Sequence, residues 1–140
     1  MIMKRRDFDL LALGEILLRL SPPENERLTR GEELNVVSGV SLLGLRTGII
    51  SKIPANDLGN FIQNRVRFCG VSDDYLVYDK TKDSRLGIYY YEYGAHPRKP
   101  NVIYDRKNTA FSEVSIDDFP EEMYRSTRCF HTTGITLALG

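Results

Sequence analysis

The segment Gly39–Gly70, GVSLLGLRTGIISKIPANDLGNFIQNRVRFCG, constrains the fold of this chain more than any other. It contains the end of a short predicted helix, Val36–Leu43, which Gly44 ends because glycine accepts the left-handed conformation at a helix C-terminus. The next residues, Thr47–Ile53, are apolar and rich in β-branched side chains, as in a buried strand. A helix and a buried strand joined by glycine are typical of a layered α/β protein.

A second helix is predicted directly after this strand. Asn56 or Asp57 can cap its N-terminus, and Gly70 ends it. Five side chains fall on one face at helical spacing: Leu58, Phe61, Ile62, Val66 and Cys69. The earlier segment Phe8–Leu13 is apolar almost throughout, as expected of a strand buried on both faces. Strands alternating with helices predict right-handed crossovers and a parallel sheet.

The second half of the chain changes character. Its predicted elements are strands at Tyr75–Tyr78, Leu86–Tyr93 and Asn101–Arg106, a helix at Ser115–Arg125, a buried strand at Cys129–Thr133, and a loop or helix at Gly134–Gly140. The middle two strands flank Gly94–Pro100, whose glycine and prolines fit the loop of a hairpin.

Composition limits the classes of function. The chain has 140 residues and 41% hydrophobic residues, enough for one core. Its formal net charge is zero, which argues against nucleic acid and anionic membranes as partners. Cys69 and Cys129 are far apart in sequence and are expected to be reduced, half-buried residues of a cytoplasmic protein. No run reaches the about 20 apolar residues of a membrane span, and Asp9 and Glu15 interrupt the resemblance to a signal peptide.

The predicted hairpin is unusually aromatic. With a two-residue period, Tyr89, Tyr91 and Tyr93 share one face of the first arm, and Tyr104 and Arg106 share one face of the second. Tyrosine rings and hydroxyls with a guanidinium suit a polyhydroxy acid. The same tyrosines equally fit a half-exposed sheet or a subunit contact. Composition alone favours this second interpretation.

No metal or nucleotide fingerprint is present. His96 and His131 do not lie in a set of residues with metal-ligand spacing, so both are expected to be structural. The phosphate-binding patterns GxGxxG and GxxxxGK[ST] are absent.

Five separated motifs resemble one known family. They are DLLALGEILLRL, LNVVSGVSLLGLRTGIISKIPANDLG, RLGIYYYEYG, VIYDRKNTA and HTTGITLAL. In this order they look like the N-terminal half of the PfkB (ribokinase-like) carbohydrate kinases, most of all the 2-keto-3-deoxygluconate kinases. The resemblance covers nearly the whole chain.

The resemblance implies a fold. A Rossmann-like, mostly parallel sheet would carry helices on both faces, with a small β lid over the sugar. Residues 1–140 would form the N-terminal portion of a single domain, truncated relative to the family, with lid elements at about 16–20 and 86–106 and a contribution from the region before Val40. The lid strands offer a surface for a homo-oligomer, and the expected ligand is a small sugar acid.

The resemblance also implies substrate-binding residues. Tyr89, Tyr104 and Arg106 would contact the sugar from the lid. Ile135 would contact it from the loop after a core strand, and Gly134 would shape that loop. No residue is assigned to a metal.

One departure from the family concerns a glycine pair before the first helix. The family reads like GGAELN, whereas this chain has Arg30 before Gly31 and retains Asn35. In one interpretation Gly31 and Asn35 still bind the sugar. In the other, which the short spacing favours, a lid strand has been lost and Asn35 only imitates the motif.

A larger departure concerns catalysis. The family's Gly-Ala-Gly-Asp motif supplies the catalytic aspartate and oxyanion-binding amides, and no Gly-Asp dipeptide occurs in this sequence. The expected aspartate therefore lies beyond residue 140, as do most contacts to ATP and Mg²⁺, the cofactors of the complete enzyme. The chain alone is expected to be inactive and to bind neither. The alternative function is a non-catalytic module for sugar binding or dimerisation.

Overall fold

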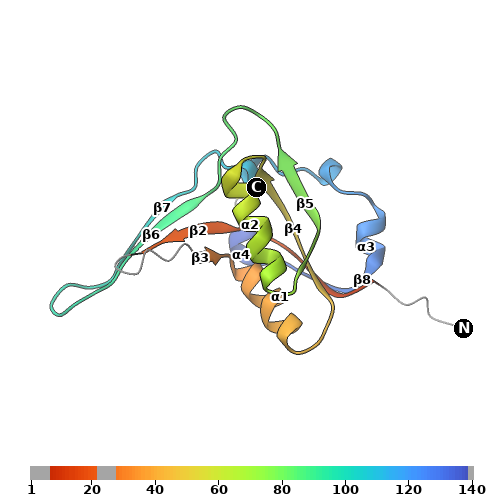
Figure 1. Cartoon of the computed structure of the whole chain (residues 1–140), viewed down its shortest axis with the longest axis horizontal. Helices are drawn as coiled ribbons and strands as arrows, with labels where there is room; N and C mark the ends of the chain where they lie inside the picture. The colour runs from red at the N-terminus through yellow and green to blue at the C-terminus, as the bar shows by residue number, and fades with distance from the viewer. Residues whose placement is uncertain (1–6, 22–27, 139–140) are drawn as a thin grey trace, which may run out of the picture.

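A computed structural model describes residues 7–21 and 28–138 of the chain. The described residues form two four-stranded sheets, a central sheet inside the α/β body and a lid sheet that projects from it (Figure 1). The central sheet has the order β5-β4-β1-β8, and the lid sheet has the order β3-β2-β6-β7.

All strand pairs of the central sheet are parallel, as predicted. Its strands are β1 (Phe8–Leu13), β4 (Thr47–Pro54), β5 (Ser72–Asp79) and β8 (Thr127–His131). The apolar runs of β1 and β4 are almost entirely buried because both strands lie in the interior of the sheet. β5 is longer than the predicted Tyr75–Tyr78.

Two helices cover one face of this sheet. α2 (Asp57–Phe68) packs on β4 and β5, and the Asn56 side chain accepts from the N–H groups of Leu58 and Gly59, which confirms the predicted cap. α1 (Glu32–Leu42) packs on β1 and β4 and is followed by Gly44 at φ +85°. α1 begins four residues before the predicted Val36, because Glu32 and Glu33 occupy its first turn, where negative charge is favoured.

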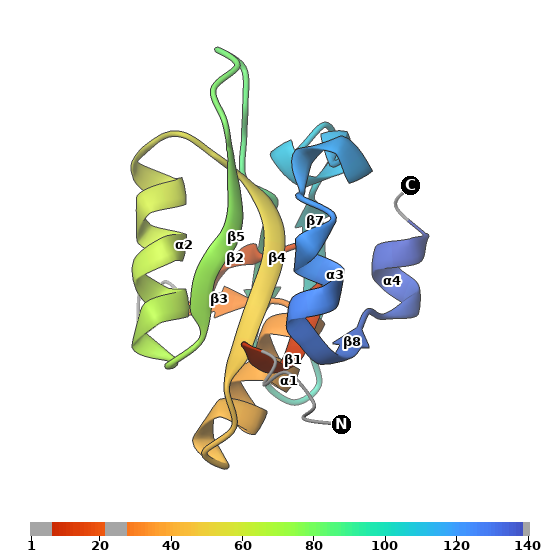
Figure 2. The same ribbon diagram turned by 90° about the vertical axis from the view of Figure 1, so that its right-hand side faces the viewer.

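The opposite face carries shorter elements, so helices lie on both sides of the sheet (Figure 2). They are the 3₁₀ turns η1 (Ala110–Glu113) and η2 (Ile116–Asp118) and the helix α3 (Glu122–Ser126). The single helix predicted at Ser115–Arg125 is wrong. Pro120 follows η2 and disfavours helical geometry at Phe119, whose φ and ψ of −126° and 139° are extended.

The lid sheet contains the strand that the short spacing before the first helix suggested had been lost. β2 (Leu17–Leu20) pairs in parallel with β6 (Ile88–Glu92), which forms the predicted hairpin with β7 (Asn101–Asp105). β3 (Leu28–Arg30) pairs antiparallel with β2 on its other side. The interpretation that a lid strand is lost before α1 is therefore wrong, since three residues suffice for this edge strand.

β8 is not the buried strand that was predicted. It forms one edge of the central sheet, and Arg128, Cys129 and Phe130 are exposed. The expected half-buried Cys129 is thus exposed, while Cys69 is half-buried, and both are free thiols. The short helix α4 (Gly134–Leu137) follows β8. Within residues 7–21 and 28–138, no helix has the length and apolarity that crossing a bilayer requires.

Candidate functional site

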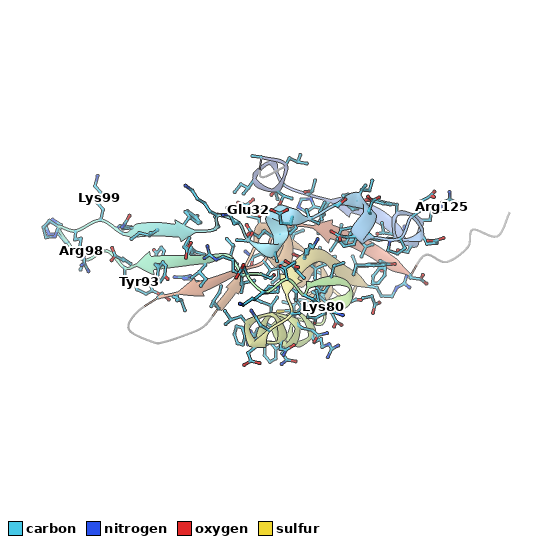
Figure 3. The ribbon with its side chains drawn as sticks, turned by 90° about the horizontal axis from the view of Figure 1, so that it is seen from above. Glu32, Lys80, Tyr93, Arg98, Lys99 and Arg125 are labelled. Atoms are coloured by element: carbon cyan, nitrogen blue, oxygen red, sulfur yellow. The ribbon has the colours of Figure 1, made fainter. Side chains whose placement is uncertain are left out.

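A pocket of about 340 Å³ lies where the lid sheet meets the central sheet. Its lining comes from the β1–β2 segment, the first turn of α1, the lid strands, and the turn after β8. Glu32 marks the junction of lid and body in Figure 3, whereas Tyr93, Arg98 and Lys99 lie toward the outer end of the lid. The carboxyl end of β1 therefore opens into the pocket, a common location for ligands in open α/β sheets.

Six of the seven predicted substrate-binding residues line this pocket: Gly31, Asn35, Tyr89, Tyr104, Arg106 and Ile135. They come from three separate stretches of sequence, which the fold brings together. The seventh, Gly134, is the first residue of α4 and lies beside the pocket without lining it.

The tyrosines form the lid side of the pocket. Tyr89 lies opposite Tyr104 in the β6–β7 pairing, and their ring centroids are 5.7 Å apart. Tyr91 also lines the pocket, whereas Tyr90 does not and is exposed. Of the face predicted for the first arm, Tyr89 and Tyr91 line the pocket, whereas Tyr93 follows β6 and does not. Tyr104 and Arg106, predicted to share a face of the second arm, both line it.

Arg106 is held by a buried carboxylate that the sequence interpretation missed. Its Nε donates to Glu15 Oε2 over 3.0 Å, and its Nη2 contacts the same oxygen. The Thr109 hydroxyl donates to Glu15 Oε1 over 2.8 Å. Glu15 is only 6% exposed. The guanidinium expected to face a ligand's carboxylate thus already has a carboxylate partner within the chain.

A second buried carboxylate, Glu33, links the first turn of α1 to the segment after β8. Its Oε1 accepts from the N–H and hydroxyl of Thr133, over 3.2 and 2.6 Å, and from the hydroxyl of Thr136. Glu33 is 3% exposed. These bonds fix the turn after β8 against α1 and so position Ile135 at the pocket.

Arg19 is the other basic residue that lines the pocket. Its Cζ lies 4.4 Å from the centroid of the Tyr91 ring, and its Nη2 donates to the Tyr93 hydroxyl over 3.4 Å. Sequence alternation could have indicated it, because Leu17 and Arg19 share one face of β2 and both line the pocket.

The described part of the chain contains no cluster of side chains suited to a metal ion. No group of three or more His, Cys, Asp or Glu side chains there could hold a metal ion. The pocket instead offers aromatic surface, hydroxyls, amide and guanidinium groups, and carboxylates. This set suits hydrogen bonding to a small polyhydroxy ligand.

Several known proteins are similar to this chain, although no family model matches it. A 2-dehydro-3-deoxygalactonokinase of Haloferax volcanii is 38% identical, over 94% of this chain and 43% of that protein. The structure of 2-dehydro-3-deoxygluconokinase from Thermotoga maritima superposes with a TM-score of 0.83 at 37% identity, over 94% of this chain and 42% of that one. A PfkB family carbohydrate kinase of Listeria grayi gives a TM-score of 0.81 at 30% identity, with 94% and 43% covered.

The chain spans less than half the length of each of these three proteins. Within that span the likeness is continuous, and the parallel sheet with helices on both faces matches the ribokinase-like fold. Its relatives are sugar kinases. Over the length of this chain, both its sequence and its fold are similar to those of sugar kinases, among them a PfkB family carbohydrate kinase.

Proposed function

We propose that this chain is the sugar-binding portion of a carbohydrate kinase that phosphorylates 2-keto-3-deoxygluconate or a closely related sugar acid with ATP and Mg²⁺. Residues 1–140 would be the N-terminal part of a single ribokinase-like domain with the lid attached. The observation that carries the proposal is the pocket that gathers Tyr89, Tyr104 and Arg106 with Asn35 and Ile135.

Each of these groups has a role in the proposed complex. The rings of Tyr89 and Tyr104 offer a flat surface to C–H groups, and their hydroxyls can bond to sugar hydroxyls. Asn35 and the backbone at Gly31 supply donors and acceptors from the first turn of α1. Arg106 keeps N–H groups beyond those bound to Glu15, and these can reach a sugar oxygen.

The chemistry of phosphoryl transfer would need residues outside this chain. A base that takes the proton of the attacking hydroxyl and donors that stabilise the phosphoryl charge are the usual requirements. The family's Gly-Asp dipeptide does not occur in the 140 residues. We therefore expect the chain alone to bind sugar acid without transferring phosphate, and sugar-dependent ATP turnover by the purified chain would contradict this.

Calorimetric titration of the 140-residue chain with 2-keto-3-deoxygluconate tests the proposal. We expect saturable binding that Tyr104→Ala weakens about tenfold or more, since a ring stacking surface and a hydroxyl are both lost. Ile103→Ala is the matched control, because Ile103 is adjacent, 51% exposed and absent from the pocket lining. Equal affinity of Tyr104→Ala and Ile103→Ala for the sugar acid would contradict the proposed binding site.

The second candidate is a dimerisation module, and the outer face of the lid favours it. Tyr90 and Ile103 lie opposite each other on the face away from the pocket and are 42% and 51% exposed. Two copies could cover this face, as lid strands offer a regular surface. Sedimentation of wild type and Ile103→Lys distinguishes the two: a mass of two chains that the variant halves supports dimerisation through the lid.

A further inference from the structure

The two edges of the central sheet differ in their protection against pairing with a further strand. One edge strand, β5, carries three aspartates in its sequence SDDYLVYD. Its register with β4 also shifts between Gly48 and Ile50, as it does at a β-bulge. Charged side chains and bulges both hinder the addition of another strand. β5 therefore has the features of an edge that faces water.

The opposite edge strand, β8, has less protection. Its residues keep one register with β1 from Thr127 to His131, and Arg128 is its one formal charge. Three consecutive residues, Arg128, Cys129 and Phe130, are exposed. Among the strands of residues 7–21 and 28–138, none pairs with β8 on its outer side. The backbone N–H and C=O groups on that side can therefore pair with an added strand.

The face of β8 that lies toward α3 combines an aromatic ring with a cation. Phe130 is 41% exposed, and its ring centroid lies 5.9 Å from that of Tyr124 on α3. Arg128 precedes Phe130 by two residues, so both side chains share this face. The Arg128 side chain is 71% exposed, and its contact with Asp9 is long at 3.5 Å. An exposed ring and an exposed guanidinium thus lie on one face of this edge strand.

We propose that β8 pairs antiparallel with β8 of a second copy of this chain, about a two-fold axis that joins the two central sheets into one. An axis normal to the sheet leaves each face on its own side, so paired residues must point to the same face. An axis through Cys129 meets this condition and pairs all five residues of β8, whereas an axis through Arg128 or Phe130 pairs three. The register centred on Cys129 therefore forms the longest symmetric ladder.

This register is also complementary in its side chains. Arg128 of each copy lies opposite Phe130 of the other, which gives two cation–π contacts between groups that one chain alone leaves exposed. Cross-strand pairs of this kind stabilise antiparallel sheets. Thr127 lies opposite His131 at both ends, so no like charges meet when the histidine is neutral. A second copy is therefore a partner that this edge fits.

The interface is separate from the two features considered above. The lining of the pocket includes no residue of β8, so the inference does not depend on the proposed function. The outer face of the lid, with Tyr90 and Ile103, belongs to the other sheet. Variants of β8 and of the lid can therefore distinguish the two modes of association.

Sedimentation equilibrium of the 140-residue chain and two variants of Phe130 tests the pairing. Phe130→Arg would place positive charges opposite each other at both symmetric positions, whereas Phe130→Glu would place a carboxylate opposite Arg128. The variants are matched, because both remove the ring and its contact with Tyr124, and they differ in the sign of the charge. Ile103→Lys is the control for association through the lid, and circular dichroism verifies that every variant is folded.

We expect wild type to form a dimer whose dissociation constant Phe130→Arg raises about a hundredfold, because like charges directly opposite each other are destabilising. Phe130→Glu should raise it less than about tenfold, and high salt should narrow the difference between the two variants. Ile103→Lys should leave it unchanged. In wild type, a short bismaleimide should join the two Cys129 thiols, which the axis places opposite each other, and Phe130→Arg should suppress this link.

Three results overturn the proposal. The first is the mass of a single chain at all concentrations measured. The second is equal weakening by Phe130→Arg and Phe130→Glu, because the charge at this position would then not face Arg128. The third is a dimer that Ile103→Lys dissociates and Phe130→Arg does not, which would assign the contact to the lid.

Discussion

Strand β4 of the central sheet and strand β7 of the lid sheet differ sharply in burial. In β4, seven of the eight residues are buried, whereas all five residues of β7 are exposed. β4 lies between two layers of helices and turns, while β7 is an edge strand of the lid sheet. The buried side chains of β4 pack in the core and cannot reach a ligand. Those of β7 are exposed and can.

The two sheets meet through polar groups. Glu15 follows β1 of the central sheet, whereas Arg106 follows β7 of the lid and Thr109 precedes η1. Hydrogen bonds are directional, so this junction fixes the angle of the lid more sharply than an apolar contact of the same size. The pocket exists because the lid is held at that angle over the end of β1.

The largest expected effect compares the same substitution in the two sheets. Ile53→Ala, in β4 at 0% exposure, should lower the free energy of unfolding by about 4 kcal/mol because it leaves a cavity. Ile103→Ala, in β7 at 51% exposure, should change it by less than about 0.5 kcal/mol. Urea unfolding followed by circular dichroism measures both, and equal losses would show that the lid is packed like the core.

The junction should give the next largest effect. Glu15→Gln should lower the free energy of unfolding by about 3 kcal/mol, because Arg106 loses its carboxylate while still partly buried. Glu121→Gln is the matched control, since its pair with Arg125 is exposed and should contribute less than about 0.5 kcal/mol. Similar values for the two variants would mean that the junction does not hold the lid.

Neighbouring tyrosines compare the two faces of the lid. Tyr89→Ala should weaken the binding of the sugar acid about tenfold, because Tyr89 lines the pocket and pairs with Tyr104. Tyr90→Ala, on the opposite face, should leave the dissociation constant unchanged. Calorimetric titration of both variants measures the dissociation constants. A weaker affinity in Tyr90→Ala would indicate that the ligand binds on the outer face of the lid.

The smallest effect concerns a charged contact of the central sheet. Burial alone would raise the pKa of Asp118, but hydrogen bonds from the Ser115 N–H and the Lys52 ammonium outweigh it and hold the pKa below 3.8. A lowered pKa in the folded state stabilises the protein above the unfolded pKa, and this stabilisation is lost as the pH falls through the folded value.

Asp118→Asn should therefore lower the free energy of unfolding by about 1 kcal/mol at pH 7, with a difference from wild type that shrinks as the pH falls below 3.8. Urea unfolding at pH 7 and pH 3 measures it. Asp117→Asn is the control, because the described bonds of Lys52 go to Asp118 and Glu113. A pH-independent difference would contradict the linkage.

Regular patterns of apolar residues predicted the strands and helices whose buried side chains follow such a pattern. The bounds of β1 agree with prediction, and β4 and α2 agree within one residue, because long apolar patterns and a capping Asn56 are local signals. β3 has no such signal, since its three residues are a strand only by pairing with β2. The break at Pro120 was readable from sequence and was missed.

The pocket was predicted through its aromatic residues and not through its carboxylates. Tyrosines on alternate positions of a strand indicate one face from the sequence alone. The roles of Glu15 and Glu33 depend on partners about 90 and 100 residues away, at Arg106 and Thr133. A lone glutamate two residues after the end of a buried strand is the one signal that could have indicated Glu15.

The parallel pairing of β2 with β6 also implies an order of folding, in which the lid sheet forms late. It joins Leu18 to Ile88, residues separated by 70 positions (88 − 18), whereas the β4–α2–β5 unit is built from adjacent segments. Closing so long a loop costs entropy, and formation of the β4–α2–β5 unit first would shorten the loop and lower that cost. We therefore expect lid substitutions to speed unfolding and to leave the rate of folding nearly unchanged.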